Sequence, residues 1–321
     1  MNKKIIVILF VIISVVIIGV LVIPRILDTG EEKTTEAEEE YKILNGGIYE
    51  ETDVLNESGL TANINKINNI CNKYLSGSNI YFAMIPNKEY YLNNDMGSSN
   101  EFFEIEGFIK PKLNQEISYI ELYDTLNLDC YYKTDMHWKQ EDISGVVEKI
   151  SQAMNLKDEN NASNDENEYE EKSLGDFYGS YYAEISNNEI QPDELKYLTN
   201  SMIENCVVYN TEKEAEEKVY NLDRVNETNN KYDLFLSGAA AIQRIDNNEI
   251  NNGKKLILFR DSFGSSIAPL LIGYYEEILL VDIRYVNSEF LDNYIDFDEY
   301  ENQDVLFLYN TRVINKSGIF R

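Results

Sequence analysis

The sequence predicts an α/β fold, in which a mostly parallel sheet is flanked by helices and preceded by one N-terminal transmembrane helix. Three observations support this prediction: a long uncharged apolar run near the start, short apolar runs typical of strands covered on both faces, and amphipathic segments between them. The chain has 321 residues, 43% of them hydrophobic, which is enough to bury a core.

The predicted membrane helix comes first. Residues 5–24, IIVILFVIISVVIIGVLVIP, contain no charge and are long enough as a helix to cross a bilayer. Lys3 and Lys4 precede this run, so residues 1–25 are expected to be a cytoplasmic tip and anchor, with everything that follows outside the cytoplasm. A cleaved signal peptide is the alternative, but the run exceeds the usual apolar length and no small-residue cleavage site follows. We expect a single-pass protein of the cell membrane.

Two acidic segments are predicted to lack packed structure. Residues 26–40 are polar and acidic without aromatic side chains, which is typical of a disordered linker. A folded domain is therefore expected over residues 41–321. Inside it, residues 156–172, LKDENNASNDENEYEEK, have the same character and predict a disordered surface loop.

Three short apolar runs are the predicted core strands. They are NIYFAMIP at residues 79–86, KLILF at 255–259 and VLFLY at 305–309. Strands buried on both faces read as continuous apolar runs of this kind, so we expect them in a parallel sheet.

Helical patterns lie between these runs. Apolar residues at a spacing of three and four predict an amphipathic helix over residues 139–154. The strand at 255–259, a helix over 265–275 and a strand from Ile278 would form a βαβ unit, which makes the two strands parallel.

Composition excludes several functions. The chain carries 28 Lys and Arg against 57 Asp and Glu, a formal net charge of −29, which opposes binding to nucleic acid. One histidine, His137, cannot build a multi-histidine metal centre. The three cysteines have no paired spacing, so neither a zinc site nor a disulfide framework is expected, and at most one internal disulfide could form: Cys71, Cys130 and Cys206.

Ser262 occupies the position of a nucleophile. It lies in RDSFGSS at residues 260–266, where a predicted strand ends and a helix begins. Ligands bind at this edge of parallel sheets, and the free N–H groups of a helix start can stabilise negative charge. A helix cap is the alternative, because Ser, Asp and Gly are also preferred at helix starts.

A serine nucleophile needs a base, and His137 is the one histidine available. It lies in TDMHW at residues 134–138, where Asp135 could orient the ring and stabilise the imidazolium. A lone Asp-x-His is more often a polar surface turn. Together with Asp-Ser-Phe-Gly after a buried strand, the pattern is a stronger signal.

These two motifs, TDMHW and RDSFGSS, resemble those of the DHHW proteins, relatives of the alginate O-acetyltransferases with SGNH-hydrolase-like catalytic domains. The resemblance implies an SGNH-like fold, with Ser262 as nucleophile, His137 as base and Asp135 as the orienting carboxylate. Weaker similarities follow in the family's order across residues 41–315: IYFAMIPNK at 80–88, GDFYGSYY at 175–182, YDLFLSG at 232–238 and LLVDIRYV at 279–286.

The chain departs from the family pattern at two positions. Met136 stands where the family name has its first histidine, which implies that the missing imidazole is not the base. Gly238 is followed by Ala239, where an asparagine is expected in many relatives. If that asparagine donates to the oxyanion, the backbone N–H groups of Ser262 and Gly264 would have to serve instead.

Two further residues have a substrate interpretation and a structural one. Arg284 either faces the site or forms an ion pair with Asp282 or Asp261. Trp138 either stacks on a sugar ring or packs beside the start of a buried helix.

The resemblance implies a membrane-anchored, extracytoplasmic O-acetyltransferase that modifies a cell-surface or secreted polysaccharide without a metal or organic cofactor. Because acetyl-CoA is cytoplasmic, it also implies a membrane-bound O-acyltransferase as the partner that supplies acetyl groups. The alternatives are a carbohydrate esterase with the same triad and a non-catalytic glycan-binding or scaffold subunit. The acidic character of the exported part predicts a neutral or partly cationic acceptor glycan.

Overall fold

The computed structural model describes residues 41–51, 54–92, 99–156, 169–228 and 230–321. The predicted anchor and the whole predicted linker precede these residues and lie outside the description. Among the described residues, no helix combines the length and the apolar character needed to cross a membrane.

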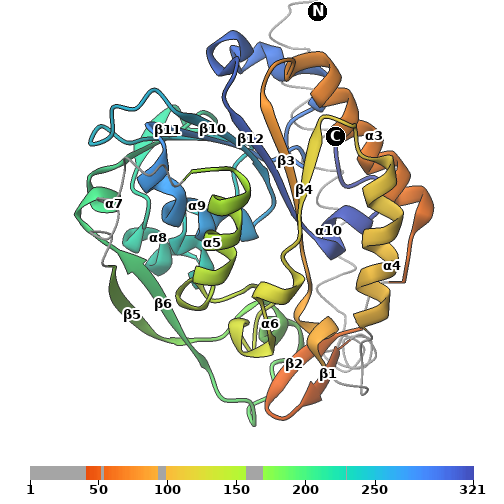
Figure 1. Cartoon of the computed structure of the whole chain (residues 1–321). Helices are drawn as coiled ribbons and strands as arrows, with labels where there is room; N and C mark the ends of the chain where they lie inside the picture. Colours follow the sequence, from red (N-terminus) through yellow and green to blue (C-terminus); the bar gives the residue numbers. More distant parts are fainter. Residues whose placement is uncertain (1–40, 52–53, 93–98, 157–168, 229) are drawn as a thin grey trace, which may run out of the picture.

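A sheet of eight strands forms the centre of the molecule, in the order β4-β3-β12-β10-β11-β9-β7-β8 (Figure 1). The first five of these strands are parallel to one another. This confirms the parallel strands predicted from the three apolar runs. The five strands are β4 (Ile117–Ile120), β3 (Asn79–Ile85), β12 (Asp304–Asn310), β10 (Lys255–Arg260) and β11 (Glu277–Val281).

The other end of the sheet is antiparallel, which the sequence pattern does not predict. Its strands carry polar side chains between apolar ones and therefore lack a continuous apolar run. They are β9 (Ile242–Asp246), β7 (Val207–Asn210) and β8 (Ala215–Glu217).

Helices cover both faces of the sheet, as Figure 1 shows. Side chains of β10 alternate between two cores: Leu256 and Leu258 lie in one, Ile257 and Phe259 in the other. The first core is closed by α5 (Ser144–Ala153) and α9 (Phe263–Leu271). The second is closed by three helices: α3 (Glu57–Tyr74), α4 (Ser99–Ile109) and α10 (Thr311–Asn315). The sheet is therefore the middle of three layers.

The predicted helices exist with shifted ends. The helix expected over 139–154 has a 3₁₀ turn at Gln140–Asp142 followed by α5. The helix expected over 265–275 begins earlier, at Phe263, and ends at Leu271 before a 3₁₀ turn. Since β10 and β11 on either side of α9 are parallel, the predicted βαβ unit is confirmed.

Smaller elements surround the sheet. Two hairpins are β1 (Tyr41–Leu44) with β2 (Gly47–Glu50), and β5 (Glu170–Phe177) with β6 (Asp193–Thr199). The short helices are α6 (Ser180–Ile185), α7 (Ser201–Asn205) and α8 (Leu222–Glu227). All three cysteines are free and buried.

The disordered acidic loop predicted over residues 156–172 extends too far toward the C-terminus, because its last residues belong to a strand. Residues 157–168 lie outside the described part, but β5 already begins at Glu170. The strand pairs with β6, and opposite charges lie beside its charged side chains: Glu171 is 2.9 Å from Lys196, and Lys172 is 3.1 Å from Glu204.

Candidate active site

Ser262 lies between the end of β10 and the start of α9, at the carboxyl edge of the sheet. Its backbone has already turned into the helical region, with φ −62° and ψ −25°, and its side chain makes no capping hydrogen bond. Asp261 takes the capping role, because its carboxylate accepts from Phe263 N at 3.0 Å and from Asn310 N at 2.6 Å. The Ser262 hydroxyl is therefore not used by the helix start.

A tight backbone turn presents His137. Tyr131 and Trp138 form an antiparallel bridge at its base, and Tyr132 N donates to the carbonyl of His137 at 3.1 Å. Asp135 lies on the same turn. The two motifs, which are more than a hundred residues apart in sequence, meet because this turn faces the end of β10.

The three predicted triad residues form one hydrogen-bonded chain. His137 Nε2 lies 2.7 Å from Ser262 Oγ, and His137 Nδ1 lies 2.5 Å from Asp135 Oδ1. An ionised carboxylate can only accept, so the proton belongs on Nδ1 and Nε2 accepts from the serine hydroxyl. This is the tautomer that general-base activation of Ser262 requires.

Asp135 is held as an ionised acceptor. It is 1% exposed, and its carboxylate also accepts from the backbone N–H groups of His137 at 2.9 Å and Ser180 at 2.6 Å. Burial raises the pKa of Asp135, but the charge of His137 and these hydrogen bonds outweigh burial and hold the pKa below its ordinary value.

Lys88 fixes the turn from beneath. Its buried ammonium donates to the carbonyls of Tyr132 at 2.9 Å, Lys133 at 3.3 Å and Asp135 at 2.8 Å. Burial lowers the pKa of Lys88 to about 8, although the negative charges of Glu89 and Asp135 act to raise it. The motif resemblance includes this lysine, but the sequence alone gives no reason to join it to the site.

Two rings fix the plane of the imidazole. Tyr232 stacks on His137 with ring centroids 3.9 Å apart and planes 15° apart, and the Phe263 ring lies 4.7 Å away on a tilt. Tyr232 was not a sequence-predicted site residue. Its place in YDLFLSG, one of the weaker family segments, is the one signal that could have indicated it.

The family model described as DHHW protein matches residues 10–281. The chain belongs to the DHHW family. Comparison with curated protein sequences finds no match.

Solved structures share the fold of this DHHW protein. A DHHW family protein from Eubacterium siraeum is 20% identical with a TM-score of 0.68, over 87% of this chain and 92% of that one. PatB1 of Bacillus cereus is 17% identical with a TM-score of 0.66, over 88% and 98%. The O-acetyltransferase domain of Pseudomonas putida AlgJ is 12% identical with a TM-score of 0.50, over 87% and 89%. All three have the mixed α/β architecture around one large sheet.

Trp138 of this DHHW protein packs in the core, which is the structural one of its two interpretations from sequence, and it is not placed to stack on a sugar. The side chain is 0% exposed, and its Nε1 donates to Ser266 Oγ at 2.8 Å. Tyr232 donates to the same Ser266 oxygen at 2.8 Å. Trp138 thereby joins the His137 turn to α9 from inside the core.

Gly264 is not an oxyanion donor in this arrangement, which corrects the expectation from sequence. Its N–H donates to the carbonyl of Asp261 at 3.1 Å. A Cβ at this position would lie 2.5 Å from Cβ of Arg260, so glycine is needed for close packing. The N–H of Ser262 has no acceptor among the described residues and remains the backbone donor at the nucleophile.

Arg284 forms the ion pair that was one of its two interpretations. Its guanidinium donates to Asp282 through Nε at 2.9 Å and Nη2 at 2.7 Å. Arg260 lies 3.8 Å from the same carboxylate and is buried. The DHHW fold thus places a buried charge network behind the nucleophile, and Arg284 is part of that network.

The loop before Ala239, the position where many relatives are expected to have an asparagine, is sharply bent. Leu236, Ser237 and Gly238 all have positive φ, at 54°, 61° and 88°. A Cβ on Gly238 would lie 2.8 Å from the Asp233 carboxylate, so both the conformation and the contact require glycine. Ala239 is exposed and brings no side-chain donor.

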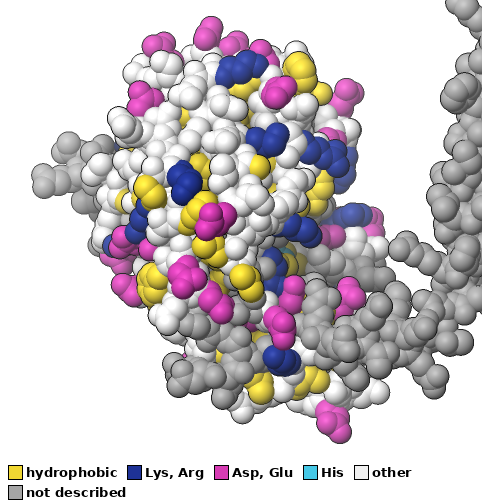
Figure 2. Space-filling view, turned by 90° about the vertical axis from the view of Figure 1, so that its right-hand side faces the viewer, with side chains coloured by type: hydrophobic (Ala, Val, Ile, Leu, Met, Phe, Trp, Pro, Cys, Tyr) yellow, Lys and Arg dark blue, Asp and Glu magenta, His cyan; other side chains and the backbone are white. Residues whose placement is uncertain are grey.

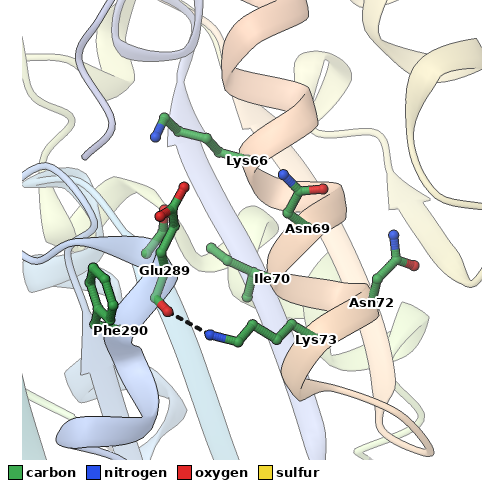
Figure 3. A pocket seen from close by; sticks show the side chains of 8 residues that line it. Lys66, Asn69, Ile70, Asn72, Lys73, Glu289 and Phe290 are labelled. Carbon is green, nitrogen blue, oxygen red and sulfur yellow. Dashed lines mark hydrogen bonds between the residues drawn. The ribbon is translucent and has the colours of Figure 1, made fainter.

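A groove of about 620 Å³ lies elsewhere, between α3 and the 3₁₀ segment Ser288–Asn293 (Figure 3). Lys73 crosses it and donates to the carbonyl of Glu289 at 2.5 Å. Its lining contains no nucleophile with a base: Lys66, Asn69, Ile70, Asn72, Lys73, Ser288, Glu289 and Phe290. Nothing in this groove matches the chemistry of the Ser262 site.

Proposed function

We propose that this protein is a membrane-anchored, extracytoplasmic O-acetyltransferase that transfers acetyl groups to a cell-surface or secreted polysaccharide. The observation that carries the proposal is the hydrogen-bonded chain from Ser262 through His137 to Asp135. Its location at the carboxyl edge of a largely parallel sheet supports the same conclusion, because ligands bind at that edge in such folds.

The first half-reaction acylates the serine. His137 Nε2 takes the hydroxyl proton while Ser262 Oγ attacks the carbonyl carbon of the acetyl donor. The tetrahedral oxyanion is stabilised by the Ser262 N–H, and Asp135 stabilises the imidazolium without taking a proton. The bond to the donor breaks as His137 returns the proton to the leaving group, which leaves acetyl-Ser262.

The second half-reaction moves the acetyl group to the sugar. His137 takes a proton from a sugar hydroxyl, and the sugar oxygen attacks the acetyl carbonyl carbon. The Ser262–acetyl bond then breaks, and Ser262 regains its proton from His137. Neither half-reaction needs a metal ion or an organic cofactor.

The proposal includes an anchor and a partner. Residues 5–24 would hold the enzyme in the membrane with its folded part outside the cytoplasm. Since acetyl-CoA is cytoplasmic, a membrane-bound O-acyltransferase would bring the acetyl group across the membrane.

The test uses the full-length chain with p-nitrophenyl acetate, with and without oligosaccharides. Acetylated sugar supports the proposal, whereas free acetate alone at every acceptor concentration indicates an esterase. Ser262→Ala should abolish both products, and Ser118→Ala, which changes an exposed serine on β4, should leave them unchanged. Wild-type activity in Ser262→Ala would contradict the proposed nucleophile, whereas a wild type that makes neither product would favour a scaffold role.

A further inference from the structure

Apolar side chains continue outward from the triad. Met136 lies between Asp135 and His137 in sequence and is half-buried. Met136 and Tyr182 pack against the same small buried cluster, which contains Ile48 of β2 and Tyr181 of α6. The Tyr182 ring in turn contacts the Tyr178 ring, with centroids 4.2 Å apart and planes 37° apart. A pair of tyrosine rings thus lies on the same small cluster as Met136, the residue between Asp135 and His137.

The segment that carries both tyrosines is fixed to the triad turn by its backbone. Ser180 N donates to Asp135 Oδ2 at 2.6 Å. Gly179 N donates to Thr134 Oγ1 at 3.1 Å, and Tyr182 N donates to the carbonyl of Thr134 at 3.1 Å. The two rings therefore have a defined position relative to the triad.

Both tyrosines are able to contact a ligand. Tyr178 is 43% exposed and Tyr182 is partly exposed. Neither hydroxyl has a hydrogen-bond partner in the part of the chain that the structure describes. A pyranose ring has an apolar C–H face and a polar rim, and an exposed tyrosine offers an apolar ring with a polar end. Trp138, the one tryptophan, is buried and unable to do this.

We infer that Tyr178 and Tyr182 form an acceptor platform, which binds a pyranose residue of the polysaccharide next to the sugar that receives the acetyl group. The inference rests on the proposed function, since the platform would hold the sugar hydroxyl against acetyl-Ser262. Stacking needs no basic side chain, so the platform suits a neutral or amino-sugar chain.

The experiment measures the two half-reactions of the full-length chain separately. Release of p-nitrophenol from p-nitrophenyl acetate reports acylation, and transfer to cellotetraose or chitotetraose reports the acceptor step. Tyr178→Ala should raise the half-saturating concentration of tetrasaccharide about 10-fold and leave acylation unchanged. Tyr178→Phe should keep most of the binding, and Tyr294→Ala, which changes a tyrosine 64% exposed on another surface, should have no effect.

The outcomes separate the platform from the proposed function. If Tyr178→Ala and Tyr182→Ala both leave the half-saturating concentration unchanged while Ser262→Ala abolishes transfer, the platform is wrong and the proposed function stands. If the wild type acetylates neither tetrasaccharide, saturation-transfer NMR on wild type and Tyr178→Phe tests binding directly. Transfer from aromatic protons to the sugar supports the platform, and its absence overturns it. This NMR test does not depend on the folding of an alanine variant.

Discussion

At the scale of single residues, Asp135 accepts three hydrogen bonds in the site. Its carboxylate accepts from the ring and the backbone of His137 and from the backbone of Ser180. It therefore orients the base and joins the turn to α6 at the same time. A substitution at Asp135 should affect both activity and stability.

Asp135→Asn should lower acyl transfer by up to about 10,000-fold, because an amide neither favours the required tautomer nor stabilises the imidazolium. Stability gives a second readout. The folded-state pKa of Asp135 is lowered, so its contribution is fully present above the ordinary pKa of about 4 and is lost as the pH falls through the folded value. Urea unfolding should show a difference between wild type and variant that shrinks from pH 6 to pH 3. A difference independent of pH would contradict this account.

Lys88→Met should lower activity at least about 10-fold, because three buried carbonyls of the triad turn lose their donor. Raising the pH through about 8 should also lower wild-type activity as Lys88 loses its proton. The free energy of unfolding should instead increase with pH. Between about pH 8 and pH 10.4 the unfolded lysine keeps its proton while the folded one has lost it, so rising pH favours the folded state.

The control is Lys149→Met, which changes an exposed lysine on α5. Activity and urea unfolding are measured for all three proteins from pH 7 to pH 10. The account of Lys88 is wrong if the Lys88→Met variant keeps full activity or shows the same alkaline loss as the wild type.

Sequence reasoning predicts the residues with chemical functions better than those with packing roles. Ser262, His137 and Asp135 were predicted from residue type and motif, and the structure brings them together. The sequence leaves two interpretations open for Trp138 and wrongly offers Gly264 as an oxyanion donor, because nothing in it says that an indole is fully buried or that an N–H already has an acceptor. Both facts depend on long-range packing.

At the scale of elements, the contact between the β5–α6 segment and the triad turn is close enough to require glycine. A Cβ on Gly179 would lie 2.2 Å from Cβ of Asp135, closer than side-chain atoms approach one another. The segment can approach the turn in this way only because residue 179 has no side chain.

Gly179→Ala should destabilise the protein by about 1–3 kcal/mol, since either the turn or α6 must move, and should remove most of the acyl-transfer activity. Gly107→Ala is the matched control: it lies inside α4 with open space around it, so alanine should stabilise the protein slightly. Thermal unfolding and p-nitrophenol release measure both effects. Equal behaviour of the two variants would contradict the packing argument.

How well each helix or strand can be predicted depends on whether burial leaves a pattern in its sequence. The parallel strands are evident because burial on both faces makes their sequences continuously apolar. The start of α9 was placed late because Asp261, rather than a residue in the apolar pattern, begins the helix by accepting from Phe263. The antiparallel strands β7, β8 and β9 depend on pairing with β11 and have no strong pattern of their own.

At the scale of the whole molecule, the negative net charge of the protein disfavours an anionic acceptor polysaccharide. The net charge is −29, and on the face in Figure 2 basic and acidic side chains are interspersed. The arginines nearest the nucleophile are already engaged: Arg260 and Arg284 both lie against Asp282. Neither arginine is therefore free to bind an anionic sugar.

Neutral and amino-sugar oligosaccharides should therefore bind better than anionic ones. Binding of cellotetraose, a chitosan tetramer and an oligogalacturonate is measured at low and at physiological salt. The neutral sugar should be insensitive to salt, because stacking and hydrogen bonds carry its binding, whereas repulsion of the anionic sugar should weaken as salt rises. Tight binding of the anionic sugar that falls steeply with salt would contradict this prediction.

The central claim is that His137 activates Ser262 as the nucleophile, and peptide mapping of the acyl-enzyme tests it most directly. The full-length chain is mixed with p-nitrophenyl acetate without acceptor, quenched in acid, digested and analysed by mass spectrometry. The account predicts one acetyl group on the Ser262 peptide in the wild type, and none there in either His137→Ala or Ser262→Ala. Acetylation of Ser262 at an unchanged rate in His137→Ala, or acyl transfer in which Ser262 is never acetylated, would contradict it.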